Sequence, residues 1–287
     1  KVLIVNVEDD DENIWRRFEA QFKHYPLKHG EEYHIRKNLH VATGRGVVGP
    51  LMRLNGTNPV PTKWAAWLES EIKRVVPDLV ILDTKSRLFG LQENSNEDNV
   101  AWLHLLESFS TEFNNSYMVI HHPNKQSVEK VGQQTSRGGG AFEDNCRFVF
   151  QGVKMDKKTA NKYGIKRYHH YFSFNHVKNS YGPGFAPIWF KRLEPEGIPL
   201  EVDLDVMCQE QVETFLRDWL DDAHVSYRDI EKEPAGKEIR EAWKKHTGRS
   251  TSDLLTQIEM LIDHGILTKN SIVKEGSKWP KTILKFK

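Results

Sequence analysis

The chain has 287 residues, of which 38% are hydrophobic and 28% are charged, enough for one large domain or two smaller ones with a buried core. No apolar run approaches the ~18–20 residues of a membrane-spanning helix, so we expect a soluble globular protein with no membrane partner. The net charge is only +1, but residues 237–287 carry 11 Lys or Arg against 6 Asp or Glu. This basic end suggests a nucleic-acid partner, although a surface with surplus lysines explains the same counts.

Residues 1–200 alternate short apolar runs with amphipathic segments. The runs predict strands at 2–7, 79–83 and 117–122, and apolar spacing of three or four predicts helices at 13–22, 63–76 and 96–113. Such strands are typical of a parallel sheet covered by helices on both faces, which gives an α/β fold with its strand 79–83 buried on both sides. Residues 43–62, rich in glycine and proline, are predicted to form a loop.

The later part of the chain changes character. Further strands are predicted at 146–153, 168–179 and 187–193, as an antiparallel extension of the sheet, and the composition changes near residues 195–199. Helices are predicted at 211–223, 236–248 and 250–265, the last two capped by Gly248 and Gly265, followed by a hairpin with a basic tip. Helices followed by a basic hairpin are typical of a winged helix, so we predict one domain at 1–200 and a winged-helix domain at 201–287.

Candidate chemical groups follow the three apolar strands of the first domain. Glu8 follows the first strand, Asp83 ends the second, and His121 and His122 follow the third. Because ligands of open parallel sheets bind at the carboxyl ends of the strands, we expect these groups on one edge. An Asp that ends an apolar strand is the arrangement that holds Mg²⁺ in nucleotide-binding sheets, although many α/β strands also end in Asp without that role.

Each of the other groups has an alternative interpretation. Glu8 can polarise an attacking water or belong to a solvated acidic turn, and the histidines can sense a phosphate or be hydrogen-bonded rim residues. The two cysteines, Cys146 and Cys208, lie far apart without the spacing of a metal site. We therefore expect a reducing, cytoplasmic compartment. The pair His121 and His122 likewise lacks the spacing of a metal site, so we expect no zinc.

Five segments, in order, resemble motifs of the RepA-type hexameric helicase ATPases. They are VEDDDENIWRRF, VILDTKSRLFGLQENSNEDN, VIHHPNK, SRGGGAFEDNCRF and HVKNSYGPGFAPIWFKR, and their common order extends over residues 1 to about 195. The resemblance implies a RecA-like P-loop NTPase core of the AAA kind, related to DnaB-type helicases and found in plasmids and mobile elements. It implies ATP and Mg²⁺ as cofactors, a homo-oligomer, expected to be a hexamer, and single-stranded DNA in a central channel.

The same resemblance assigns roles to individual residues. Glu8 matches the general base, Asp83 the Mg²⁺ carboxylate of the Walker B motif, and His122 with His121 the histidine motif near the γ-phosphate. The remaining matches are arginines and a lysine that act at the nucleotide interface: Arg147 and, as second choice, Arg137 as the finger from the neighbouring subunit, Arg17 turned towards the interface, and Lys178 acting across it. Ser180 stands where DnaB-like relatives carry a second arginine, which weakens a finger role there.

A phosphate-binding loop, G-x-x-x-x-G-K-[ST], is absent from the 287 residues. In the family this loop follows a strand upstream of the segment resembling residues 1–8, so we expect residues before Lys1 to carry it, and residues 1–287 to bind ATP poorly. That strand is central in a RecA-type sheet, and its loss is expected to leave two neighbouring strands with unpaired backbone groups, at about 1–3 kcal/mol for each group.

The leading hypothesis is an ATP-dependent DNA helicase or replication ATPase with sites between subunits. The alternative is a DNA-binding replication initiator or regulator whose RecA-like part is a degenerate, non-hydrolysing oligomerisation platform; the missing loop favours it and the retained Glu8 and Asp83 count against it. Residues 125–130 are a candidate channel loop. In the winged helix, which binds duplex DNA or docks a protein, the candidate groove or phosphate contacts are Arg249, Ser250, Thr251, Ser252 and Gln257.

Overall fold

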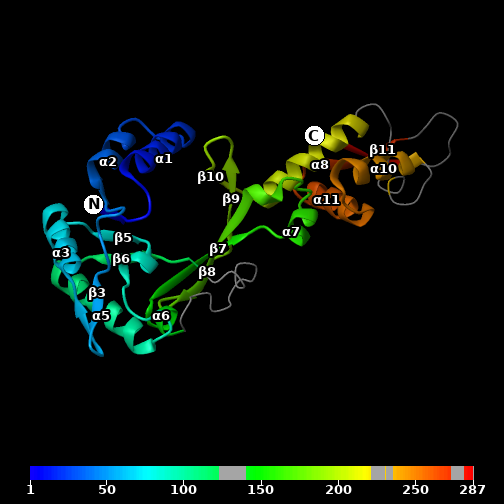
Figure 1. The fold of residues 1–287 in the computed structure, drawn as a ribbon. Coiled ribbons are helices and arrows are strands. Elements are labelled where there is room, and N and C mark those ends of the chain that lie inside the picture. Colours follow the sequence, from blue (N-terminus) through cyan, green and yellow to red (C-terminus); the bar gives the residue numbers. More distant parts are fainter. Residues whose placement is uncertain (123–139, 221–229, 231–234, 273–280, 287) are drawn as a thin grey trace. The chain divides into compact units, whose positions relative to one another are not determined.

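The computed structural model describes residues 1–122, 140–220, 230, 235–272 and 281–286 (Figure 1). The chain divides into two compact units. The first comprises Lys1–Val153, Phe174–Pro187 and Arg192–Leu200, and the second comprises Lys154–Ser173, Ile188–Lys191 and Glu201–Lys287. Residues 201–287 therefore lie in one unit, which also takes two segments from earlier in the chain.

The first unit contains a parallel sheet in the order β2-β1-β5-β6. Two helices, Lys63–Val75 and Asn96–Phe113, supply most of the helical apolar side chains that pack with it. The elements up to residue 122 are β1 (Val2–Asn6), α1 (Asp11–His24), α2 (Glu31–Asn38), β2 (Leu39–Thr43), β3 (Met52–Asn55), β4 (Asn58–Pro61), α3 (Lys63–Val75), β5 (Leu79–Asp83), α4 (Lys85–Leu88), α5 (Asn96–Phe113) and β6 (Ser116–Ile120). The predicted α/β class with a parallel sheet and helices is confirmed. The strand β2 was not predicted. The predicted loop 43–62 contains the β3–β4 hairpin, since the three prolines and Gly56 of this segment are compatible with four-residue edge strands.

The core of this unit lies on one side of the sheet. Val80 and Leu82 of β5 are fully buried against apolar residues of α3 and α5, such as Leu68 and Trp102. Leu79 and Ile81, which point to the other side, are only partly buried. The prediction that this strand is buried on both faces is therefore wrong for the described part of the chain, since only alternate residues reach the core.

The strands β5 and β6 pair directly. Their register runs from Leu79 opposite Ser116 to Asp83 opposite Ile120. This pairing leaves no place for a strand between β5 and β6, but within the described residues β6 is the last strand of its sheet and pairs on one side only, as does β7 in the other sheet. The expectation that a missing strand leaves two neighbours with unpaired backbone groups therefore stays a prediction.

The later strands form a second sheet rather than an extension of the first. Its order is β10-β9-β8-β7, and its residues are shared between the two units. The elements are α6 (Gly140–Asn145), β7 (Phe148–Lys154), α7 (Lys157–Lys162), η1 (Tyr168–His170), β8 (Tyr171–Asn179), β9 (Ile188–Leu193) and β10 (Ile198–Val202). The predicted late strands exist, but their edge does not join the parallel sheet within the described residues.

The second unit has its own apolar core. Its elements after residue 203 are α8 (Leu204–Leu220), α10 (Ala235–Thr247), α11 (Thr251–Asp263), β11 (Leu267–Ile272) and β12 (Lys281–Phe286). Trp243 of α10 and Ile258 of α11 are fully buried, and Leu267 and Leu284 bring the antiparallel β11–β12 hairpin into the same cluster. The described part of the chain thus places three helices and a hairpin around one core.

Two residues predicted to contact DNA have other partners. Arg249 is only 5% exposed, and its Nη1 donates to Cys208 Sγ at 2.8 Å. Ser250 caps α11 in a reciprocal pair with Asp253. The prediction for Arg249 is wrong, because its guanidinium packs inside the unit over Trp243, and the Ser250 hydroxyl is engaged by the helix itself. Gly248 has the positive φ of 75° that the predicted cap requires.

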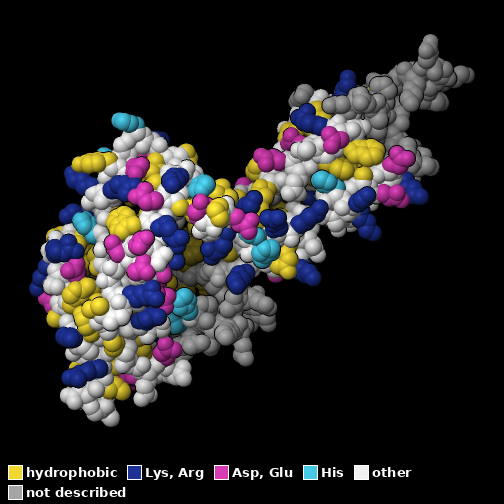
Figure 2. Space-filling model, turned by 45° about the horizontal axis from the view of Figure 1, so that its top comes forward, with side chains coloured by type: hydrophobic (Ala, Val, Ile, Leu, Met, Phe, Trp, Pro, Cys, Tyr) yellow, Lys and Arg dark blue, Asp and Glu magenta, His cyan; other side chains and the backbone are white. Residues whose placement is uncertain are grey.

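Charged side chains of both signs are interspersed on the surface in view in Figure 2. None of the helices in the described ranges is both long and apolar enough to cross a bilayer.

Candidate functional site

The three predicted strand ends meet at one edge of the parallel sheet. Asn6, the last residue of β1, lies opposite Asp83 of β5, and Asp83 lies opposite Ile120 of β6. Glu8 therefore follows β1 next to the place where Asp83 ends β5 and where His121 and His122 leave β6. The sequence prediction of a shared edge is confirmed, since parallel pairing in register brings the carboxyl ends together.

Asn6 joins the first two strand ends. Its side chain is 4% exposed, and Nδ2 donates to Asp83 Oδ2 at 2.7 Å. Its Oδ1 accepts the backbone N–H groups of Glu8 at 3.0 Å and Asp9 at 2.7 Å. One amide therefore orients the Asp83 carboxylate and fixes the turn that carries Glu8. Sequence analysis missed Asn6, although a lone amide inside the apolar run VLIVNV was a visible signal.

Glu8 lies between two groups that can carry positive charge. Its Oε2 is 3.4 Å from His122 Nε2, and its Oε1 is 3.5 Å from Arg87 Nε. The Glu8 side chain is 32% exposed, so water reaches it. A carboxylate held in this way can accept a proton from a bound water and pass it to solvent or to the imidazole.

Asp83 is half-buried and has acidic neighbours. Burial, followed by the negative charges of Glu8 and Asp9, raises the pKa of Asp83 above its usual range. A bound cation would offset both effects, and Mg²⁺ is typically held by one or two carboxylates together with substrate phosphates. Asp83 with Glu8 beside it fits that role. The described residues contain no cluster of three or more His, Cys, Asp or Glu that would form a complete metal site by itself.

The other predicted residues lie outside this pair of carboxylates. Arg17 donates to Asp9 at 2.7 Å, which places it beside the acidic turn after β1. The His121 ring packs against Phe142, with ring centroids 6.3 Å apart. Lys178 donates its Nζ to the carbonyls of Glu143 and Asp144 in α6.

The arginine candidates for the finger differ in what the structure describes. Arg147 is exposed and directly precedes β7. Arg137 and the candidate channel loop 125–130 lie outside the described residues.

A buried lysine two residues after Asp83 was also missed. Lys85 is 1% exposed, its Nζ donates to Asn99 Oδ1 at 2.7 Å, and it lies 4.1 Å from the ring centroid of Phe142 and 4.4 Å from that of Phe89. Burial lowers the pKa of Lys85 to about 8. Lys85 thus ties the end of β5 to α5 and α6, so the carboxylate edge is packed against the helix that leads to Arg147.

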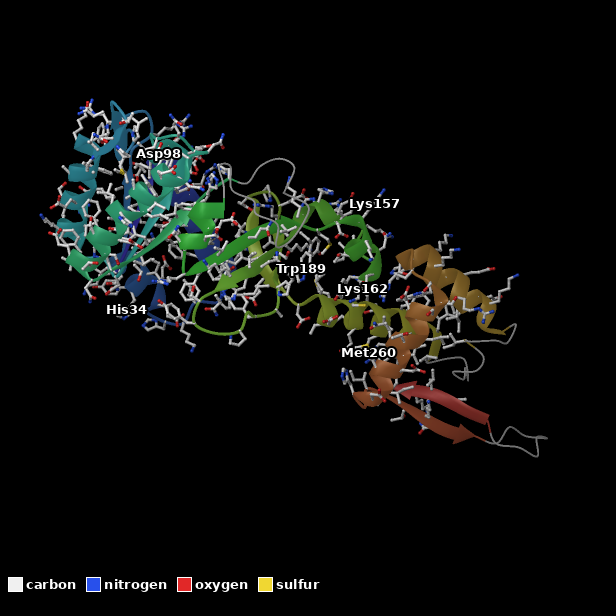
Figure 3. The ribbon with its side chains drawn as sticks, turned by 90° about the horizontal axis from the view of Figure 1, so that it is seen from below. His34, Asp98, Lys157, Lys162, Trp189 and Met260 are labelled. Atoms are coloured by element: carbon white, nitrogen blue, oxygen red, sulfur yellow. The ribbon has the colours of Figure 1, made fainter. Side chains whose placement is uncertain are left out.

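The polar loop after Asp83 serves this packing. The Ser95 side chain caps α5, and Asp98, labelled in Figure 3, accepts the N–H of Gln92 at 2.9 Å. Asn99 donates to the carbonyls of Glu93 and Ser95 while it accepts from Lys85. The acidic and amide side chains of this polar loop therefore build the start of α5 and accept from the buried ammonium of Lys85. The composition of the loop alone did not indicate this structural role.

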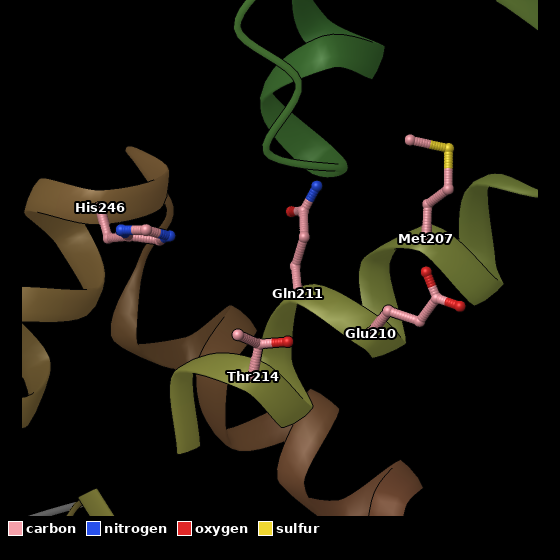
Figure 4. A pocket seen from close by; sticks show the side chains of 5 residues that line it. All are labelled: Met207, Glu210, Gln211, Thr214 and His246. Atoms are coloured by element: carbon pink, nitrogen blue, oxygen red, sulfur yellow. The ribbon is translucent and has the colours of Figure 1, made fainter. Parts of the chain in front are cut away.

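A separate hollow lies in the second unit, between α8 and α10 (Figure 4). Its volume is about 330 Å³, and its lining residues are Met207, Glu210, Gln211, Thr214 and His246. It is open to solvent and contains none of the strand-end residues, so it supplies no group to the site described above.

Comparisons with known proteins bear on the first unit. Residues 1–128 match a family model described as AAA domain, which is less than half of the chain. Among solved structures, the chain is similar to an ATPase domain, with a TM-score of 0.47 and 10% sequence identity over 70% of this chain and 74% of that chain. A likeness at this level carries no argument about function. The comparison with curated proteins gives no match.

We predict that Asn6→Ala destabilises the protein by about 1–3 kcal/mol, because it leaves Asp83 without its donor and two N–H groups without their acceptor. Urea unfolding at pH 7 measures the change. The control is Asn55→Ala in the exposed β3–β4 turn, which should change the free energy of unfolding by less than about 0.5 kcal/mol. Equal effects of the two substitutions would contradict the bridging role of Asn6.

We predict that Lys85→Met raises the melting temperature at pH 7 by a few degrees, roughly the shift that 1 kcal/mol produces. Below pH 8 the folded protein holds a buried charge that methionine does not have. Between about pH 8 and pH 10.5, Lys85 is neutral in the folded protein but still protonated in the unfolded protein. The free energy of unfolding of the unmodified protein therefore rises with pH in this range, and the advantage of methionine should fade.

Melting curves at pH 7 and pH 10 test this pH dependence. The exposed Lys28→Met should show no such change between the two pH values. A Lys85→Met protein that melts below the unmodified protein at both pH values would refute the assignment of a net burial cost to Lys85.

Proposed function

We propose that this protein is an ATP-dependent DNA helicase or replication ATPase of the RepA type, which hydrolyses ATP between subunits of a ring to move on DNA. The observation that carries the proposal is the contact of Glu8 with His122, 3.4 Å apart, beside Asp83 at the carboxyl edge of a parallel sheet. The match of residues 1–128 to the AAA domain family supports an ATPase.

In this proposal, each strand-end group acts on a different part of the reaction. Asp83 would hold Mg²⁺, which would supply positive charge to the nucleotide phosphates. Glu8 accepts the proton of the attacking water, and His122, hydrogen-bonded to Glu8, reports the state of the γ-phosphate. Asn6 positions both carboxylates, since it contacts Asp83 and the turn of Glu8.

Charge that develops on the γ-phosphate requires further cations from a neighbouring subunit. An arginine brought from a neighbour is worth roughly 10³–10⁵ in rate. Arg147 is our first candidate, because it is exposed at the start of β7, and Lys178 of β8 is the second cation. A site completed by the next subunit makes hydrolysis depend on the geometry of the ring, which couples ATP use to movement.

We propose that the three helices and the β11–β12 hairpin of the second unit form a winged helix that binds duplex DNA. Thr251 and Ser252 at the start of α11 remain available for phosphate contacts, whereas Arg249 and Ser250 are engaged inside the unit. The exposed Lys245 of α10 and Lys285 of β12 supply positive charge.

We predict that Glu8→Gln lowers DNA-stimulated ATP hydrolysis at least about 100-fold, because glutamine cannot accept the proton of water. Residues 1–287 contain no G-x-x-x-x-G-K-[ST] sequence, so steady-state hydrolysis and strand unwinding are measured on the full gene product. Glu112→Gln near the end of α5 is exposed and is the matched control that should retain activity. Survival of both activities in Glu8→Gln would rule out this mechanism and favour a non-hydrolysing initiator or regulator.

For the second unit, we predict a steep loss of duplex-DNA affinity with rising salt, because lysine–phosphate contacts release counterions. Replacing Lys285 by Ala should weaken binding to all sequences alike and reduce the slope of log affinity against log salt by about 1. Fluorescence anisotropy of a labelled duplex between low and physiological salt measures both quantities, with Lys23→Ala of α1 as the control. A flat salt response would instead assign this unit to protein docking.

A further inference from the structure

The strands β7 and β8 carry an outward-facing group of aromatic residues, called here the aromatic face. Its members come from β7, β8 and the loop after β8: Phe148, Phe150, Phe174, His176, Tyr181 and Phe185. All of them belong to the first unit. Four are substantially exposed: Phe148 and Phe185 at 48%, Phe150 at 39% and Tyr181 at 74%.

The outward side of these strands is unusually apolar, and the buried side carries polar residues beside the apolar Val153 and Tyr171. The polar Gln151 and Asn175 point to the buried side, at 6% and 4% exposure, and Asn175 Nδ2 donates to the Gln151 carbonyl. Phe148 and Phe150, on the other side of β7, face outward. A strand with one solvated face normally places its apolar residues inward, so this arrangement indicates that the outer side is covered in the working protein.

The aromatic rings already use their flat faces on one another. Phe150 stacks on Phe174 with ring centroids 5.1 Å apart and planes at 7°, and on His176 at 5.0 Å and 17°. His176 in turn stacks on Phe185 at 4.5 Å and 23°. Nucleobases bind proteins by stacking on open ring faces, and these rings are largely taken. Aromatic side chains that are already stacked on one another suit packing against another protein surface.

The charges around the aromatic face also favour a protein over a nucleic acid. Arg147 precedes Phe148, and Lys178 lies two residues beyond His176, but Lys178 contacts the backbone of Glu143 and Asp144, two acidic residues of α6. The residues beside the aromatic face therefore carry charges of both signs. A nucleic-acid strand brings a negative charge with every nucleotide and would favour a surplus of positive charge there.

We infer that the aromatic face is a contact surface for a second copy of this chain. The inference rests on the proposed function, in which Arg147 and Lys178 complete the site of the neighbouring subunit. Lys178 lies on the same side of β8 as Phe174 and His176, and Arg147 directly precedes β7, so a neighbour close enough to receive these cations also lies near the aromatic face. The acidic run Glu8–Glu12 at the receiving edge complements the charge of Arg147.

Replacing Tyr181 and Phe185 together by Ser tests the inference. Both lie in the loop between β8 and β9, outside the strands, so the fold should tolerate the change. Sedimentation velocity of the full gene product over a range of concentrations measures its assembly. We expect the variant to assemble with a dissociation constant at least about tenfold higher, as for the loss of a well-packed interface anchor.

The matched control replaces Tyr33 and Val76 together by Ser. These residues are 64% and 68% exposed and belong to the same unit, on α2 and after α3, away from the aromatic face. The control should assemble like the unmodified protein, and both variants should keep their melting temperatures within about 2 °C.

Two outcomes would overturn the inference: an unmodified protein that stays monomeric at tens of micromolar, or a Tyr181/Phe185 variant that assembles normally. If that variant also loses affinity for a labelled oligothymidine, the aromatic face is a nucleic-acid contact instead. Glu8→Gln, measured beside it, separates this question from the proposed function. If Glu8→Gln retains ATPase activity while the Tyr181/Phe185 variant dissociates, the contact surface stands and the catalytic mechanism fails.

Discussion

The pairing of β1 with β5, closed at its end by the Asn6–Asp83 hydrogen bond, is the constraint on which the candidate site depends. A parallel pair brings two carboxyl ends to one edge, but it does not orient the side chains that leave that edge. The buried Asn6 amide does so, because it donates to one carboxylate and accepts from the turn that carries the other. Without the Asn6 amide, Glu8 and Asp83 would be neighbours, but their carboxylates would have no fixed orientation relative to each other.

The edge is also unfavourable for folding in the absence of a ligand. The pKa of Asp83 is raised by burial and by nearby acids, and two residues later a lysine is buried beside aromatic rings with its pKa lowered. Both shifts mean that the charged form is disfavoured in the folded protein. Concentration of such groups at one place is typical of functional sites, where binding of a charged partner restores the balance.

Element types were largely predictable from local patterns. The helix at 96–113 and the strand at 79–83 were predicted to the residue, because apolar spacing of three or four marks the helix and a short apolar run marks the strand. The strand β2 and the β3–β4 hairpin were missed, since short partly exposed strands carry little apolar signal. Arg249 was misplaced for a related reason: a sequence gives the charge of an arginine but not the cysteine and tryptophan that surround it.

The sequence by itself determined that Glu8, Asp83 and His122 follow apolar strands, because apolar runs and their polar ends are local features. Only the tertiary structure decided what those groups contact. It paired β5 directly with β6, assigned the polar loop 93–99 to holding Lys85, and turned Phe148 and Phe150 of β7 outward. These outcomes depend on pairing between segments distant in the chain, where strand order and register select the neighbours of each side chain, and no local pattern carries that information.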